Sequence, residues 1–339
     1  MIYVLIFALA VIGAGVVYQW IGLRRDAALY PPPGRLVKAG AHRLHVYEMG
    51  QGSPAVILES GISATSVNWR YVQTAIAKFT RVLSYDRAGL GWSDPARTPR
   101  NACQISDELQ EMLQAAQVPP PYVLVAHSFG ALVVRLYAMR HPDDIAGIVL
   151  VDPIRPQEWY PLSDEQRHNL RGGAFLSSWG ALLARLGVVR FTLSRLARGS
   201  SSLPRLIGRA TSTGAGLATM ERLVGEVRKM PKELWPAIIS HWCQPKSFSS
   251  MGGHLAELPT SIASIIDTAP LSGIPVTILT GATSRTKWRA EELPTVSTDT
   301  TRIIAEKSGH WIQLDEPELV VNAVRELCER SLRRRSLPV

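Results

Sequence analysis

Apolar residues recur along the chain in two alternating patterns. Short and nearly continuous apolar runs, typical of strands buried on both faces, occur at Tyr122–Ala126 and Ile145–Val151. Apolar residues at helical spacing occupy Asn101–Gln117 and Phe129–Arg140. Strands that alternate with helices predict an α/β domain, with a mostly parallel sheet covered by helices on both faces. The same patterns predict further strands at Arg35–Lys38, Leu44–Glu48, Ala55–Glu59, Arg81–Tyr85, Pro275–Thr280 and Thr301–Ala305, and further helices at Val67–Lys78 and Glu318–Arg333.

The alternation of strands and helices stops after Pro153. From 154 to 272 the spacing is mostly helical, with helices expected at Gly180–Ala197, Leu217–Lys229 and Glu233–Trp242. This stretch is far longer than an ordinary connecting loop. We therefore expect one α/β core, built from residues 35–153 and 273–339 with a basic tail, and interrupted by a helical cap at 154–272.

The first 23 residues contain no ionisable side chain, and about 20 helical residues span the hydrocarbon core of a bilayer. Arg24 and Arg25 close this segment, and the prolines Pro31–Pro33 mark residues 24–34 as a linker. Residues 1–23 are thus predicted to be a single-pass transmembrane anchor, with the catalytic domain in the cytoplasm by the positive-inside rule. A cleaved signal peptide and a buried helix are the alternatives.

The composition narrows the classes of protein and partner. Of 339 residues 46% are hydrophobic and 19% charged, which suits a packed core and excludes a disordered chain. The three scattered cysteines exclude a disulfide scaffold and a cysteine zinc cluster. A net charge of +9 favours an acidic partner, and without nucleic-acid-binding motifs we expect membrane lipid and no nucleic acid. The leucines near Leu182 and Leu183, with arginines between them, fit either a solvated amphipathic cap helix or one resting on anionic lipid.

The strongest chemical signal is the segment Ala126–Gly130, which carries Ser128 between a predicted buried strand and a helix. This is the context of a nucleophile elbow, with Ala126 in place of its first glycine. The turn exposes the serine hydroxyl and directs the Phe129 amide into the same space. A second amide, from Ile62 at the end of the strand Ala55–Glu59, is expected to complete an oxyanion hole.

A serine hydroxyl needs a base to become a nucleophile. His310 follows the last predicted strand, so it is expected to face Ser128 where the carboxyl ends of the strands converge. A carboxylate should orient this histidine. The loop after Pro275–Thr280 has no acid before Glu291 and Glu292, whereas Asp152 leaves the preceding strand at the same edge. Asp152 is the favoured third member, with Glu291 or Glu292 as the alternative.

Together these motifs resemble the bacterial α/β-hydrolase fold proteins of the serine esterase and lipase superfamily, from Gly34 to Arg330. The motifs that carry the resemblance are Leu58–Ile62, Tyr85–Ser93, Ala126–Gly130, Val151–Pro153 and Ser308–His310. It implies an eight-stranded sheet, a helical cap and a Ser-His-acid triad without metal or organic cofactor. The acid is missing from its usual loop, but haloalkane dehalogenase-like relatives place it at the position of Asp152. A serine nucleophile differs from the aspartate of epoxide hydrolases and dehalogenases of this fold.

The sequence therefore predicts a membrane-anchored serine hydrolase that cleaves carboxylic esters, with a small and lipophilic ester as substrate. An acyltransferase, an amidase or a carbon–carbon bond hydrolase with the same triad is the first alternative. A non-catalytic binding module at the membrane is the second, although such a module has no need of Ser128 and His310 in these places. The physiological substrate and the oligomeric state are left open.

Overall fold

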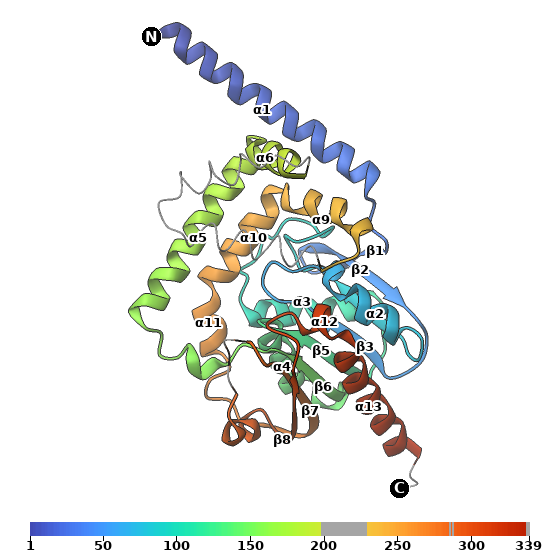
Figure 1. Ribbon diagram of the computed structural model, residues 1–339. Helices are drawn as coiled ribbons and strands as arrows, with labels where there is room; N and C mark the ends of the chain where they lie inside the picture. The colour runs from blue at the N-terminus through green and yellow to red at the C-terminus, as the bar shows by residue number, and fades with distance from the viewer. Residues whose placement is uncertain (198–228, 285, 287, 337–339) are drawn as a thin grey trace.

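One sheet organises the molecule, and the computed structural model describes residues 1–197, 229–284, 286 and 288–336 (Figure 1). The sheet has eight strands in the order β1-β2-β4-β3-β5-β6-β7-β8. Strand β2 runs antiparallel to both neighbours, and every later pairing is parallel. The predicted eight-stranded and mostly parallel sheet is confirmed. Its strands are β1 (Arg35–Ala39), β2 (His42–Met49), β3 (Ala55–Glu59), β4 (Val82–Tyr85), β5 (Tyr122–His127), β6 (Ile145–Val151), β7 (Leu271–Gly281) and β8 (Ser297–Ala305).

Side chains alternate between two apolar layers, because successive residues of a strand point to opposite faces. In β3, Ile57 packs in one layer, under α3 (Ala102–Ala115) and α4 (Gly130–Arg140). Val56 and Leu58 pack in the other, under α2 (Arg70–Ile76) and α13 (Pro317–Ser336). Both faces of the sheet are covered, as the continuous apolar runs of the strands require. Short helices η1 (Ser66–Trp69), η2 (Pro142–Asp144), η5 (Ala290–Thr295) and α12 (Ile312–Asp315) connect these elements.

Between β6 and β7 the described part of the chain contains helices and no strand. These helices are η3 (Pro156–Glu158), α5 (Asp164–Arg185), α6 (Val188–Ala197), η4 (Lys232–Leu234), α9 (Trp235–Trp242), α10 (Pro245–Ala256) and α11 (Leu258–Ala263). The single helix predicted at Gly180–Ala197 is wrong: α5 and α6 meet at 84°. The break falls at Gly187, whose φ of +76° is left-handed and ends a helix. The predicted helix Leu217–Lys229 lies outside the described residues except for Lys229.

The N-terminal helix α1 (Ile2–Leu29) projects from the body of the protein (Figure 1). It is long and apolar enough to cross a membrane, a property that it shares with signal sequences. The helix continues six residues past the predicted end of the span at Leu23, because Arg24–Leu29 are compatible with a helix. Pro31 follows Tyr30 and cannot continue it.

Candidate active site

Ser128 stands on a sharp turn between β5 and α4. Its φ of +54° lies in the left-handed region, which costs a non-glycine residue of order 1–3 kcal/mol and is typical of functional sites. The Ser128 amide donates to the Val151 carbonyl at 3.0 Å, which fixes the turn against the end of β6. Gly130 lets α4 approach β3, because a Cβ there would lie 2.8 Å from the Ser60 oxygen. The turn leaves Ser128 half-buried, with its hydroxyl available to a substrate.

Asp152 and His310 are brought together at the same edge of the sheet. His310 Nδ1 lies 2.7 Å from Asp152 Oδ2. Asp152 is buried, with 2% of its surface exposed, and follows β6 directly, so it sits beside the turn that carries Ser128. The Ser128 hydroxyl makes no hydrogen bond to another described residue, and serine–histidine contacts often tighten only when substrate binds. The three predicted triad residues therefore come from three neighbouring loops at one edge.

The loop after β7, which lacks an acid, supplies hydrogen-bond donors to Asp152 instead. The Ser284 hydroxyl donates to Oδ2 at 2.7 Å and the Gly281 amide donates to Oδ1 at 3.2 Å. These donors hold the side chain of Asp152 in the orientation that directs Oδ2 at His310. The sequence interpretation gave Ser284 no role. Its place in the loop that usually carries the acid was the signal that pointed to it.

Neither glutamate offered as an alternative acid contacts His310. Glu292 accepts a hydrogen bond from Arg155 at 2.5 Å and another from the Arg289 amide at 2.8 Å. Glu291 is exposed in the adjacent position of η5. The hydrogen bonds of Glu292 are thus directed at two arginines, whereas the carboxylate that reaches the histidine is Asp152.

Two main-chain amides lie beside Ser128 without a partner. Within the described residues, neither the Ile62 nor the Phe129 amide donates a hydrogen bond to the protein. Gly61 brings the first of them close, since a Cβ at Gly61 would lie 3.4 Å from the Ser128 Cβ. Free amides next to a nucleophile are the donors that an oxyanion hole requires. The free amides of Ile62 and Phe129 are therefore available for the role that the sequence predicts, which stays a prediction.

Comparison with known proteins agrees with the fold. Residues 54–173, which include Ser128 and Asp152, match the family model described as alpha/beta hydrolase fold. A thermophilic esterase from Thermogutta terrifontis superposes with a TM-score of 0.58 at 20% identity, over 88% of this chain and 98% of that one. The protein has the α/β-hydrolase fold. Its curated relatives include hydrolases and acyltransferases.

Two curated proteins match shorter stretches of the chain. The uncharacterized protein YqjL of Bacillus subtilis is 37% identical over 107 residues, which is 32% of this chain and 42% of that protein. The 2-hydroxymuconate semialdehyde hydrolase of Pseudomonas sp. is 32% identical over 124 residues, or 36% of this chain and 44% of that enzyme. The alignments thus span less than half the length of either relative.

Beneath the candidate site, the buried Arg87 holds the loop that carries Ile62. Its guanidinium donates to the Ser60 carbonyl and, at 3.3 Å, to that of Gly61. Glu59 pairs with Arg87, but burial raises the pKa of its carboxyl. On the cap side, Arg87 Nη1 donates to His254 Nε2 of α10 at 3.4 Å. Arg87 therefore links the oxyanion loop to a cap helix.

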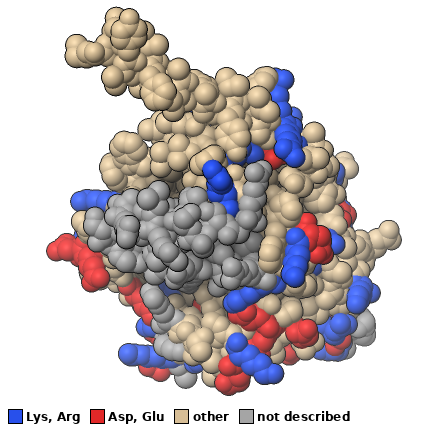
Figure 2. Space-filling view, turned by 45° about the horizontal axis from the view of Figure 1, so that its top comes forward, with Lys and Arg blue, Asp and Glu red and all other residues tan. Residues whose placement is uncertain are grey.

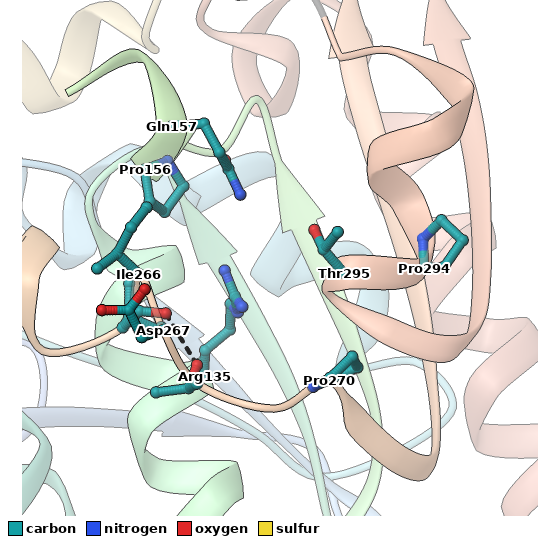
Figure 3. A pocket seen from close by; sticks show the side chains of 10 residues that line it. Arg135, Pro156, Gln157, Ile266, Asp267, Pro270, Pro294 and Thr295 are labelled. Carbon is teal, nitrogen blue, oxygen red and sulfur yellow. Dashed lines mark hydrogen bonds between the residues drawn. The ribbon is translucent and has the colours of Figure 1, made fainter. Parts of the chain in front are cut away.

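A separate pocket of about 440 Å³ opens between α4, η3 and η5 (Figure 3). Arg135, Pro156 and Thr295 are among its lining residues, and none of the predicted triad lines it. Burial lowers the pKa of Arg135 to about 10. In the described part of the chain, no cluster of histidine, cysteine and acidic side chains is arranged to hold a metal ion.

Proposed function

We propose that the protein is a serine hydrolase that cleaves carboxylic esters through an acyl-enzyme on Ser128. The observation that carries this proposal is the 2.7 Å contact between His310 and the buried Asp152, next to a serine held at a φ of +54°. A carboxylate on Nδ1 fixes the imidazole tautomer that leaves Nε2 free to accept a proton. The esterase with the same fold supports an ester substrate.

In the proposed reaction, His310 Nε2 takes the hydroxyl proton as Ser128 Oγ attacks the ester carbonyl carbon. The amides of Ile62 and Phe129 hold the oxyanion, and Asp152 stabilises the imidazolium that forms. When the tetrahedral intermediate collapses, the bond to the alkoxide breaks and His310 gives that oxygen its proton. A water molecule then attacks the acyl-enzyme, with His310 again as base, and releases the acid and free Ser128.

We further propose that α1 anchors the enzyme in a membrane, with the catalytic domain on the cytoplasmic side. The helix has no charged side chain before Arg24. Residues 2–14 are exposed. An exposed apolar helix of this length is costly in water and stable in a bilayer. A substrate that partitions into the membrane, a lipophilic ester, fits this location.

Fluorophosphonate labelling of the purified full-length protein tests the nucleophile. We expect labelling at Ser128, located by peptide mass spectrometry, and none in Ser128→Ala. Turnover of a series of esters from acetyl to long acyl chains then tests the substrate class. Labelling elsewhere, or none in folded protein, would contradict a catalytic Ser128, and a strict preference for acetyl esters would contradict the lipophilic substrate.

A carbon–carbon bond hydrolase is the second candidate. The 32% identity over 124 residues to 2-hydroxymuconate semialdehyde hydrolase favours it. Such a reaction also passes through charge on a substrate carbonyl oxygen, which the same amides could hold. Parallel assays with ring-fission products and esters distinguish the two: turnover of the former alone would favour the second candidate.

A further inference from the structure

Large apolar side chains are exposed on the cap, along one face of α5 and at the start of α6. We call the following residues the apolar cap face: Phe175, Leu176, Trp179 and Leu183 of α5, and Val188 and Phe191 of α6. Exposed fractions reach 69% at Leu176 of α5 and 51% at Phe191 of α6. The spacing of the α5 members places them on one side of the helix. A continuous apolar surface of this kind marks a contact with another phase or molecule.

The corner between α5 and α6 is held against the predicted membrane helix. A Cβ at Gly15 of α1 would lie 2.3 Å from the Leu186 oxygen, and one at Gly187 would lie 2.6 Å from the Gly15 oxygen. The two backbones can approach this closely only because both positions are glycine. Figure 1 shows α6 beside the middle of α1, with the N-terminal end of α1 projecting beyond it.

The position of this contact along α1 sets its depth in a bilayer. Arg24 and Arg25 belong at the headgroups, which puts Leu23 at the edge of the hydrocarbon core. Gly15 then lies about 12 Å inside that edge, at 1.5 Å per residue along a helix normal to the membrane. Because the corner touches Gly15, it cannot stay in water when α1 spans the bilayer. Figure 2 shows no charged side chain on the projecting end of α1.

Several polar groups near the corner contact one another, which lowers the cost of placing them at this depth, although Arg190 Nη2 has no hydrogen-bond partner among the described residues. Gln19 of α1 is buried, with 3% of its surface exposed. It donates to the Cys243 carbonyl at 2.8 Å and accepts from Arg190 Nε at 2.9 Å. Arg190 also pairs with Asp26 at 2.7 Å, one helix turn beyond Leu23 on the headgroup side. The arginine thus reaches from the hydrocarbon edge back toward the headgroups.

We propose that the α5–α6 corner is inserted in the bilayer beside α1, with the apolar cap face against lipid acyl chains. The inference rests on the membrane anchoring of the proposed function. Lipid is the occupant because the apolar cap face adjoins the exposed apolar surface of α1 at the depth of the span. Helix α5 packs on α10, whose His254 contacts Arg87 under the oxyanion loop, so the embedded corner leads toward the active site.

Depth-dependent fluorescence quenching tests the insertion. Two full-length variants are prepared in a Cys103→Ser background, one with Leu183→Cys and the other with Phe191→Cys. An environment-sensitive fluorophore is attached to the introduced cysteine of each. The protein is reconstituted in phosphatidylcholine and phosphatidylglycerol vesicles, with or without a nitroxide on the lipid acyl chain. Leu332→Cys on α13 is the matched control, since Leu332 is 50% exposed and far from the cap. At positions 183 and 191 we expect blue-shifted emission, most of which the nitroxide quenches. At position 332 we expect neither the blue shift nor the quenching.

Three outcomes would overturn the insertion. Water-like emission at positions 183 and 191 means that the apolar cap face stays outside the bilayer. Blue-shifted emission without nitroxide quenching means that protein covers it, and a shift that disappears on dilution among more vesicles identifies that protein as a second copy. Fluorophosphonate labelling of Ser128 in the same vesicles reports on the hydrolase separately, so either proposal can fail without the other.

Activity supplies a second readout. Leu183→Asp with Phe191→Asp should lower turnover of a long-chain ester held in vesicles and leave turnover of a soluble short-chain ester unchanged. Leu332→Asp should change neither. Equal turnover of the vesicle substrate by the double variant and the parent protein would contradict a role for the inserted corner in substrate access.

Discussion

The imidazole Nε2 of His127 lies 2.8 Å from the main-chain oxygen of His310. A carbonyl oxygen can only accept, so Nε2 carries the proton and donates. The two rings lie 4.5 Å apart, with Trp311 against His127 at 4.7 Å. Burial, aided by the neighbouring His310, lowers the pKa of His127 well below its ordinary value. His127, which precedes the proposed nucleophile Ser128, is thus a neutral hydrogen-bond donor that holds the backbone of the proposed base His310.

We expect His127→Ala to lower kcat by roughly 10- to 100-fold, because His310 loses a contact that fixes its position. KM should change little, since His127 has no role in substrate binding. His127→Gln, which can still donate from its amide, should recover part of kcat. The measurement is steady-state kinetics on a soluble ester, with the exposed His168→Ala as control. Equal losses in the Gln and Ala variants would argue against the donor role.

Asp152→Asn should lower kcat by roughly 10³- to 10⁴-fold while the protein remains folded. An amide in place of the carboxylate neither stabilises the imidazolium nor fixes its tautomer. Ser284→Ala, which removes one donor to Asp152, should have a smaller effect. Glu292→Gln is the control and should leave kcat unchanged, because Glu292 pairs with Arg155. A large loss in that variant together with a mild one in Asp152→Asn would assign the acid to η5.

The strands were predictable because each is buried on both faces, so an apolar run almost coincides with a strand. Strand β6 is the run Ile145–Val151 itself. Strand β7 begins at Leu271, four residues before the predicted Pro275, because its first part is only partly buried and includes exposed Ser272 and Gly273. The cap was less predictable. Gly187 lies within a helical apolar pattern, and only its left-handed backbone reveals the corner there.

In the site, the sequence could predict that Ser128, His310 and Asp152 lie near one another, because strand order alone brings the ends of parallel strands together. It could not choose firmly between Asp152 and the glutamates, because that choice depends on the direction of side chains in three loops. The donors Ser284 and His127 were missed for the same reason. Ser284 had a signal in its loop, but the role of each residue is established only by the atom that its side chain faces.

Gly61→Ala should lower kcat and leave the fold largely intact. A Cβ there would lie 2.9 Å from His127 Nδ1 and 3.4 Å from the Ser128 Cβ, so the oxyanion loop must shift. A donor displaced from the oxyanion can cost about 10²-fold in kcat. Gly172→Ala in α5 is the matched control, because no atom lies within 4 Å of its Cβ. That control should keep full activity and gain about 0.5–1 kcal/mol in the free energy of unfolding. Full activity in Gly61→Ala would remove Ile62 from the oxyanion hole.

Stability should fall as the pH is lowered from 8 to 5. Burial is the main cause that lowers the pKa of His127, His254 and, to about 4, His241. Below pH 6.5 the unfolded chain binds protons at these sites that the folded protein does not, so the free energy of unfolding decreases. Each group contributes up to about 1.4 kcal/mol per pH unit.

The measurement is the thermal midpoint of detergent-solubilised protein at each pH. His241→Phe should flatten its pH dependence, because phenylalanine keeps the packing on Trp92 and does not titrate. The exposed His168→Phe should leave the pH dependence as it is in the parent protein. A midpoint that rises on acidification would show that the buried histidines take up protons in the folded state.

Arg135→Met should raise the stability of the protein. Arg135 is 7% exposed on α4, and its Nε has no hydrogen-bond partner among the described residues. Among the described residues, no acidic side chain forms an ion pair with the Arg135 guanidinium. A buried charge without a counterion opposes folding, so a methionine of similar length should increase the free energy of unfolding by roughly 1–4 kcal/mol. Arg140→Met, at the last residue of α4, removes only the exposed pair with Asp107 and should change the free energy of unfolding by less than about 0.5 kcal/mol. Thermal unfolding of both variants decides the point: a less stable Arg135→Met would mean that the pocket of Figure 3 stabilises the guanidinium.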